Sequence, residues 1–183
     1  ELEVTALADT NPDRLRDTAR THGIAHTFAD YRELINSGTV DIIALPTPPF
    51  LHADITVAAL EAGVHVIAEK PIATSEEDIE RIEAAARQSK ALYTINYVLR
   101  RNPIVERLGR ILDGACLGAV QSFSFTNYAQ TTSLEADHWF WDTSKSGGIW
   151  VEHGVHFFDL FRSLLADEPT DPCLRSECRD DAG

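Results

Sequence analysis

The chain has 183 residues, with 16 Lys and Arg against 29 Asp and Glu, so its formal net charge is −13 with neutral histidines. This length fits one ordinary domain or two small ones, and 44% hydrophobic with 25% charged residues is typical of a packed globular protein. An acidic chain without a basic stripe argues against nucleic-acid binding, because proteins bind phosphate backbones with clustered Lys and Arg. No apolar run approaches the roughly 20 residues that cross a bilayer, so we expect a soluble protein without a membrane partner.

Two further counts bear on the compartment and the extent of the chain. The three cysteines, Cys116, Cys173 and Cys178, are odd in number and form no Cys-x-x-Cys pair, which favours a reducing compartment and a cytoplasmic protein. The sequence has no methionine and begins at Glu1, just before a strand-like apolar run. We therefore expect translation to start upstream and the chain to be a fragment of a longer protein.

The chain begins with a strand and a helix. The short apolar run over 4–8 predicts a strand, and Asn11-Pro12-Asp13 supplies an N-cap, a first-turn proline and an acid at the positive end of a helix. Gly23 can end that helix in the left-handed conformation. Another short helix is predicted to begin at Asp30.

Three more strands are predicted in the first half of the chain. The apolar run over 40–45 ends at a proline-rich turn, because proline lacks the donor that a sheet ladder needs. Helical periodicity over 51–62 precedes a strand over 64–68. Thr74 and Glu77 fit a capping box that opens a helix to about Lys90.

A last strand over 91–96 completes this alternation of short apolar strands and amphipathic helices. The pattern predicts right-handed βαβ units, and thus a doubly wound parallel sheet covered on both faces. The fold class is α/β, a Rossmann-like sheet that lacks its first strand and glycine loop.

The pattern of apolar and polar residues changes after residue 96. A helix is predicted over 103–113, and residues 120–128 alternate apolar and polar side chains, as in a sheet wet on one face. Gly147-Gly148 leads into a strongly apolar helix that ends near Leu165.

We therefore expect three segments. Residues 1–96 would form a partial nucleotide-binding domain, and residues 97–165 the start of an α/β domain with an open mixed sheet. Residues 166–183 are polar and charged, which predicts a disordered tail.

Asp9 follows the first predicted strand, where a carboxylate can accept hydrogen bonds from an adenosine ribose. An acid here would repel the 2′-phosphate of NADP and so favours NAD weakly, although an acid that merely begins a helix would look the same. The glycine loop that binds pyrophosphate should lie about 20 residues before such an acid, and hence upstream of Glu1. None of the ten glycines lies in a Gly-x-Gly arrangement.

Two loops follow consecutive parallel strands and should face one crevice, since ligands bind outside the carboxyl ends of strands in open α/β sheets. They are residues 46–52 and Glu69-Lys70-Pro71. Lys70 could be partly desolvated there and stabilise an alkoxide. The alternative is a lysine paired with Glu69 at the entrance of a helix.

The late helix carries Glu152, His156 and Asp159 at i, i+4 and i+7, on one narrow stripe. This stripe could form a site, or it could be the solvated face of an amphipathic helix. A metal site built from His138, His153 and His156 is a third possibility. The spacing differs from the zincin His-Glu-x-x-His pattern, so we expect no metal.

Taken together, two groups of motifs resemble the glucose-fructose oxidoreductase, inositol dehydrogenase and rhizopine catabolism family (Gfo/Idh/MocA). The first group comprises Pro46-Thr47-Pro48-Pro49 with His52, Leu60-Glu61-Ala62-Gly63-Val64-His65-Val66, and Glu69-Lys70-Pro71. The second comprises Gly147-Gly148 followed by Gly154, His156 and Asp159. The resemblance covers roughly residues 1–165.

This resemblance implies an N-terminal Rossmann domain and a C-terminal α/β domain, usually oligomeric through its open sheet, that oxidises or reduces sugars or polyols with NAD(P). It implies that Lys70 and His156 are catalytic, together with Glu152, which stands where inositol dehydrogenase-like members have aspartate. His156 would act as general base or acid, Lys70 would stabilise the developing alkoxide, and Glu152 would orient His156 or bind a substrate hydroxyl. We assign cofactor binding to Asp9, Thr47, Pro48, His52, Glu69, Lys70 and Pro71, and substrate binding to Lys70, Glu152, His156 and Asp159.

Two other functions stay open at this point. One is a non-catalytic protein that binds a nucleotide or sugar as a sensor, because a fold does not guarantee chemistry. The other is a metal-dependent hydrolase or lyase. We expect the parent protein to be an active homo-oligomer, and residues 1–183 alone to have little dinucleotide affinity and no turnover.

Overall fold

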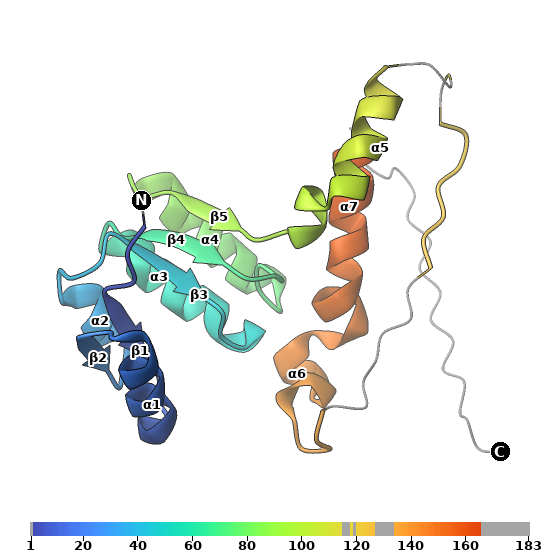
Figure 1. The fold of residues 1–183 in the computed structure, drawn as a ribbon. Coiled ribbons are helices and arrows are strands. Elements are labelled where there is room, and N and C mark those ends of the chain that lie inside the picture. Colours follow the sequence, from blue (N-terminus) through green and yellow to red (C-terminus); the bar gives the residue numbers. More distant parts are fainter. Residues whose placement is uncertain (1, 115–117, 119, 127–133, 166–183) are drawn as a thin grey trace.

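The computed structural model describes residues 2–114, 118, 120–126 and 134–165 (Figure 1). Its first part is a layered α/β unit, and its second part is a group of helices that lies beside the ends of the strands. The tail predicted over 166–183 lies outside the described residues.

The strands form two small parallel sheets. β1 (Ala6–Ala8) pairs with β2 (His26–Phe28), and β3 (Ile42–Leu45), β4 (His65–Ala68) and β5 (Tyr93–Ile95) pair in the order β3-β4-β5. In the usual Rossmann order 3-2-1-4-5-6, these are strands 3-2 and 4-5-6. No described residue occupies the place of strand 1, between β1 and β3. The predicted Rossmann-like fold without its first strand is confirmed.

The helices of this unit begin and end close to the predicted positions. They are α1 (Pro12–His22), α2 (Tyr31–Asn36), the short 3-10 helix η1 (Pro49–Leu51), α3 (His52–Glu61) and α4 (Glu76–Gln88). Asn11 caps α1, and Gly23 ends it with φ of 67°, as predicted. The predicted capping box at Thr74 is wrong by one residue. Ser75 is the N-cap, because its Oγ accepts from the backbone N–H of Asp78 and donates to the Asp78 carboxylate.

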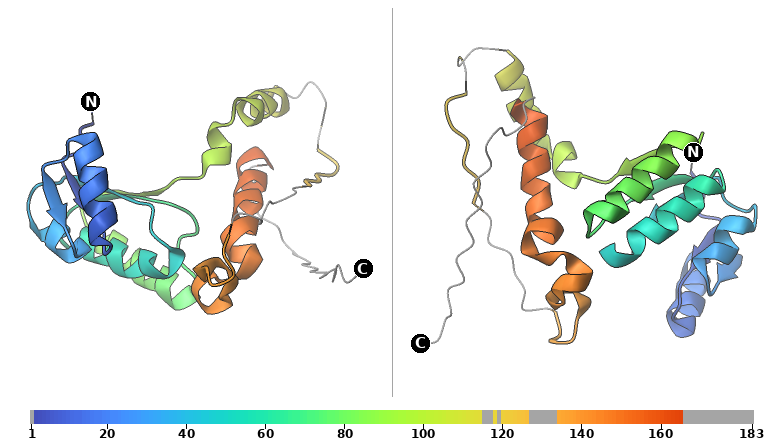
Figure 2. Two further views of the ribbon diagram at one scale, coloured as in Figure 1. Left: turned by 60° about the horizontal axis from the view of Figure 1, so that its bottom comes forward. Right: turned by 180° about the vertical axis from the view of Figure 1, so that it is seen from behind.

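The hydrophobic core lies between the three-stranded sheet and α3. Leu60 and Val66 are each 1% exposed, and Ala59 and Ala68 are fully buried. Helices α3 and α4 lie together on one face of this sheet (Figure 2). On the other face, Ile42 and Ile67 are each 37% exposed.

The second part of the chain is helical where it is described. It contains η2 (Val98–Arg101), α5 (Pro103–Asp113), η3 (Trp139–Trp141), α6 (Thr143–Ser146), a π-helical turn labelled η4 (Trp150–Gly154) and α7 (Val155–Leu165). Helices α5 and α7 pack against each other. No helix among the described residues is long and apolar enough to cross a membrane.

The predicted strand over 120–128 is not found in its described part, residues 120–126, which has no regular secondary structure. Its alternating pattern has another cause. The Phe123 ring lies edge-on to Phe161, with centroids 4.5 Å apart, and the Phe125 ring lies 4.4 Å from Phe157. Phe123 and Phe125 therefore pack on α7, and no strand among the described residues pairs with this segment.

Replacing Leu60 by alanine tests whether this core holds the first part together. Because Leu60 is 1% exposed, we expect Leu60→Ala to lower the free energy of unfolding of the complete protein by about 2 to 5 kcal/mol, from lost burial and the cavity left behind. Urea unfolding measures the change. Leu92, which is 73% exposed, provides the matched control Leu92→Ala, and equal losses in the two variants would contradict the assignment of the core.

Candidate functional site

Two loops define one end of the three-stranded sheet. The strand β3 ends at Leu45 and β4 at Ala68, and the backbone N–H of Glu69 still donates to the Leu45 carbonyl at 3.1 Å. Thr47 and Lys70 therefore leave the sheet side by side. Lys70 is followed by a cis peptide bond to Pro71.

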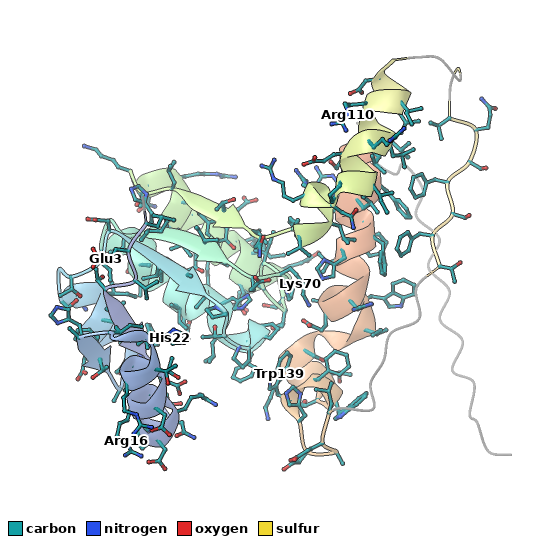
Figure 3. The ribbon with its side chains drawn as sticks, in the orientation of Figure 1. Glu3, Arg16, His22, Lys70, Arg110 and Trp139 are labelled. Atoms are coloured by element: carbon teal, nitrogen blue, oxygen red, sulfur yellow. The ribbon has the colours of Figure 1, made fainter. Side chains whose placement is uncertain are left out.

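Lys70 reaches out of this loop to the helices of the second part (Figure 3). Its Nζ donates to Glu152 twice, at 2.7 Å to the backbone carbonyl and at 2.5 Å to Oε1. The Lys70 and Glu152 side chains are 16% and 13% exposed, so this ion pair is shielded from water. Two parts of the chain 82 residues apart meet at this contact.

Glu152 lies in the π-helical turn η4, directly before α7. Such turns interrupt the regular pattern of backbone bonds and occur often at functional sites. Gly147 precedes the turn with φ of 74°, and a Cβ there would lie 2.7 Å from the Val151 side chain. At Gly154 a Cβ would lie 2.9 Å from the Trp150 ring. These two glycines allow the close packing that places Glu152 in front of Lys70.

His156 lies on α7, one turn after Glu152. The pKa of His156 is lowered below its ordinary value, first because burial disfavours the charged ring, and then because the Lys70 ammonium and His153 repel a positive charge. The carboxylates of Glu152 and Glu69 act in the opposite direction. These interactions place the imidazole in the electric field of Lys70, and they favour its neutral form.

Three buried polar atoms around this contact have no hydrogen-bond partner among the described residues. They are Thr47 Oγ1, Glu152 Oε2 and His156 Nδ1. Burying such atoms unpaired is costly. A hydroxyl, an imidazole nitrogen and a carboxylate oxygen could together bind a polar ligand.

Asp159 is paired with Arg100. Its two carboxylate oxygens accept from Arg100 Nε at 2.8 Å and from Arg100 Nη2 at 2.5 Å. Asp159 is 7% exposed, and Arg100 belongs to η2, which follows β5. The pair therefore joins α7 to the segment that leaves the sheet, which differs from the substrate-binding role expected from the sequence.

Asp9 lies directly after β1, as expected for a ribose-binding acid, but it is already bonded. Its carboxylate accepts from the Arg14 side chain at 2.5 and 2.8 Å and from the Asn11 backbone N–H at 2.8 Å. The hydrogen bond from Arg14 lowers the pKa of Asp9, with a smaller opposing effect of burial. Arg14 is 64% exposed, so a ligand could displace it.

His52 has a different position from the one expected of a cofactor contact. It is fully buried, with Nδ1 2.7 Å from the Pro71 carbonyl oxygen and Nε2 2.9 Å from the Thr47 carbonyl oxygen. Both ring nitrogens therefore face backbone rather than the crevice. Glu69 accepts from the Asn96 side-chain amide at 2.8 Å, Pro48 is half-buried, and Pro71 is buried.

The structure gives no support to the metal-site alternative. His138 lies before η3, where its Nδ1 accepts from the Phe140 backbone N–H at 3.2 Å. His153 and His156 have ring centroids 6.1 Å apart. No group of three or more metal-ligating side chains occurs in the part of the chain that the structure describes.

The sequence-predicted residues thus fall into two sets. The structure brings together Lys70, Glu152 and His156, with Thr47 in the adjacent loop, whereas Asp159 and His52 serve contacts between segments. Sequence reasoning did not anticipate Arg100 or Arg14 as partners of the predicted acids. Arg14, five residues from Asp9, could have been suggested by its nearness in the sequence, but Arg100 and Asp159 lie 59 residues apart.

The lowered pKa of His156 predicts how its titration responds to Lys70. We expect the midpoint of His156 in the complete protein to lie below the ordinary 6.5, and to rise in Lys70→Met, which removes a repelling charge and leaves Glu152 unpaired. NMR titration of the histidine ring signals measures both. Lys145→Met, at an exposed lysine paired with Asp142, is the control and should leave the midpoint unchanged. An unchanged midpoint in Lys70→Met would show that Lys70 and His156 do not interact.

The lowered pKa of His156 also makes the free energy of unfolding depend on pH. The unfolded chain takes up a proton at His156 near pH 6.5, while the folded protein resists it, so the unfolded state binds more protons between the lowered pKa and 6.5. The free energy of unfolding should therefore fall as the pH drops through this window, and less so in His156→Gln. Urea unfolding at several pH values measures the difference.

Removing the Arg100–Asp159 pair should destabilise the protein independently of Lys70, Glu152 and His156. Asp159→Asn weakens two charge-assisted hydrogen bonds, and we expect it to lower the free energy of unfolding by about 1 to 2 kcal/mol, below the upper values for charged bonds because water still reaches Arg100. Chemical unfolding gives this value. Asp142→Asn, at a half-exposed acid, is the comparison, and a loss no larger than that of Asp142→Asn would show that the pair contributes little.

Comparisons with known proteins identify the family of the chain. Residues 1–97 match the family model described as "Oxidoreductase family, NAD-binding Rossmann fold", and residues 105–181 match the Gfo/Idh/MocA C-terminal domain. The chain is 28% identical over 165 residues to levoglucosan dehydrogenase of Pseudarthrobacter phenanthrenivorans, covering 88% of this chain and 42% of that protein. It is 30% identical over 178 residues to 1,5-anhydro-D-fructose reductase of Ensifer adhaerens, covering 92% and 51%.

Solved structures give the same result. Levoglucosan dehydrogenase in complex with NADH and levoglucosan superposes with a TM-score of 0.75 at 26% identity, over 88% of this chain and 44% of that one. The WlbA dehydrogenase of Bordetella pertussis has a TM-score of 0.77 at 24% identity, over 89% and 47%, and shares the fold. The chain spans about half the length of these relatives. With family models matching both its parts and their motifs meeting at one site, the chain belongs to the Gfo/Idh/MocA oxidoreductase family.

Proposed function

We propose that the protein containing this chain is an NAD(P)-dependent oxidoreductase that transfers hydride between nicotinamide and a secondary alcohol of a sugar, polyol or related molecule. The observation that carries the proposal is the contact of Lys70 with Glu152 beside His156, at the carboxyl ends of β3 and β4. This is the edge of an open α/β sheet where ligands bind. The names of the relatives support the same reaction class, since they include sugar dehydrogenases and reductases.

The described residues fit a dinucleotide along this edge of the sheets. Asp9 follows β1, and Thr47 and Glu69 follow β3 and β4. Thr47 Oγ1 is buried and without a described partner, so this hydroxyl can form a hydrogen bond with a ligand. The cofactor, when bound, supplies the carbon that accepts or gives the hydride.

Lys70 is suited to stabilise negative charge on the reacting oxygen. An ammonium has three N–H donors, and Glu152 accepts two of them, which leaves one for a substrate hydroxyl. The two bonds hold the ammonium in place before substrate arrives, and a preorganised donor stabilises a developing alkoxide more than a mobile one.

His156 is suited to take or return the hydroxyl proton. Burial and Lys70 favour its neutral form, and a neutral imidazole can act as a base. Lys70 repels the imidazolium that forms, while Glu152 attracts it, so both charges act on the proton transfer. The Glu152 carboxylate bonds to Lys70 in the structure, and we propose that it orients Lys70 directly and His156 through its charge.

NAD is weakly preferred over NADP in this proposal. Asp9 follows β1, the position from which a carboxylate would accept hydrogen bonds from a ribose and repel a 2′-phosphate. Arg14 neutralises part of that charge, which limits the preference. We further propose that the protein works in the cytoplasm as a homo-oligomer on small sugar-like substrates.

Replacing the two central side chains in the complete protein tests the reaction. We expect His156→Ala to lower kcat for oxidation of polyols with NAD by about 100- to 10,000-fold, the usual contribution of an acid–base group, and Lys70→Met to act similarly. NADH binding, measured by fluorescence, should be largely kept in His156→Ala. His22→Ala is the control, because His22 is exposed at the C-terminal end of α1.

The alternatives give different outcomes in the same experiment. A sensor protein would bind NADH or a sugar and show no turnover in the unmodified protein. An enzyme that keeps its full rate without His156 would contradict the proposed acid–base role. Stoichiometric zinc or manganese in the purified protein would favour a metal-dependent hydrolase or lyase.

A further inference from the structure

His52 stands out among the described side chains because it is polar, fully buried and placed between the two loops of the site. It is the first residue of α3. Its Nδ1 lies 2.7 Å from the carbonyl oxygen of Pro71, and its Nε2 lies 2.9 Å from the carbonyl oxygen of Thr47. Both partners are hydrogen-bond acceptors, and a neutral imidazole carries one N–H, so the ring donates to one of the two carbonyls, and the tautomer decides which one.

Each of the two carbonyls belongs to a loop that carries a residue of the site. The Thr47 carbonyl lies in the loop after β3, whose Thr47 Oγ1 is buried without a described partner. The Pro71 carbonyl follows Lys70 immediately in the chain, after the turn from β4. The imidazole is thus a rigid spacer between the two backbones, and its position limits how far the Lys70 backbone can move.

The Lys70 backbone must be held in place because the Lys70 ammonium makes two hydrogen bonds to a residue 82 positions away in the chain. Its Nζ must meet both the carbonyl and the carboxylate of Glu152, on the other part of the molecule. A four-carbon side chain is flexible, so its end is well placed only if its backbone is held. A displacement near 1 Å in a catalytic group can lower a rate by about 100-fold.

We infer that His52 is a positioning residue, which donates from Nδ1 to the Pro71 carbonyl and so holds Lys70 in place against Glu152 and beside His156. The catalytic side of this inference rests on the proposed function. The placement of Lys70 does not rest on the proposed function, because the titration of His156 reports it in a protein that is not turning over substrate.

Two variants of His52 separate the roles of its two ring nitrogens. An asparagine amide lies near the Nδ1 position and can still donate toward Pro71, whereas a glutamine amide lies near Nε2 and can donate only toward Thr47. We expect His52→Gln to raise the NMR titration midpoint of His156 in the complete protein, in the same direction as Lys70→Met. We expect His52→Asn to leave the midpoint close to that of the unmodified protein.

A double variant shows whether the effect passes through Lys70. If it does, His52→Gln combined with Lys70→Met should give the midpoint of Lys70→Met alone, because a residue that acts through another has no effect once that residue is gone. Thr56→Val is the matched control. Thr56 is fully buried on the same helix, and its Oγ1 has no described partner, so this change should not move the midpoint.

A measurement on the unmodified protein covers the case in which the variants do not fold. The His52 Nδ1–H should appear as a slowly exchanging NMR signal with a scalar coupling to the Pro71 carbonyl carbon. An unprotonated Nδ1 would overturn the inference. So would a His156 midpoint that moves equally in His52→Asn and His52→Gln, or that moves additively in the double variant.

Discussion

The contact between Lys70 and Glu152 is the constraint on which the rest of the site depends. A shielded ion pair is stable only with good geometry and further hydrogen bonds, and here the Glu152 backbone carbonyl provides a second acceptor for the same ammonium. The contact links the turn after β4 to the start of α7, and so it decides where His156 lies relative to the sheet. It also shapes the chemistry of that imidazole, since the charges of Lys70 and Glu152 act on its proton in opposite directions.

Several other features of the structure hold Lys70 and Glu152 in place. The π-helical turn and its two glycines bring the Glu152 backbone close to the sheet. The pair between Arg100 and Asp159 joins the first half of α7 to the segment after β5. On the sheet side, His52 lies between the two loops. The site is therefore held from three directions, by backbone packing, by an ion pair and by a buried imidazole.

Much of this arrangement could be predicted from the sequence, and the failures have physical causes. Strands β3 and β4 and helices α1 and α5 were predictable because their apolar runs, caps and prolines are local signals. Strand β2 was missed because it has three residues, of which His26 and Thr27 are exposed, and so shows no apolar run. The convergence of Lys70, Glu152 and His156 was predicted from the family motifs, and the structure places these residues together.

The remaining contacts could not be predicted because they depend on distant parts of the chain. Nothing near Asp159 indicates that its partner is Arg100. A helical repeat of 3.6 residues also assumes a regular helix, so the stripe of Glu152, His156 and Asp159 could not reveal the wider turn at Glu152. His52 gave one usable signal, since most positions after it on α3 are small or apolar, with Asp54 and Glu61 as exposed exceptions, which is typical of a helix with a broad buried face.

The division of the strands into two sheets bears on how firmly each part is held. β1 and β2 pair only with each other among the described residues, and α1, which packs on them, has no buried side chain. Ala6, Ala8 and Phe28 of these two strands nevertheless pack against the buried core that β3 and β4 share with α3. The two sheets are therefore joined through side chains among the described residues. Because Asp9 directly follows β1, its position relative to Lys70 depends on this shared core rather than on a continuous ladder of backbone hydrogen bonds.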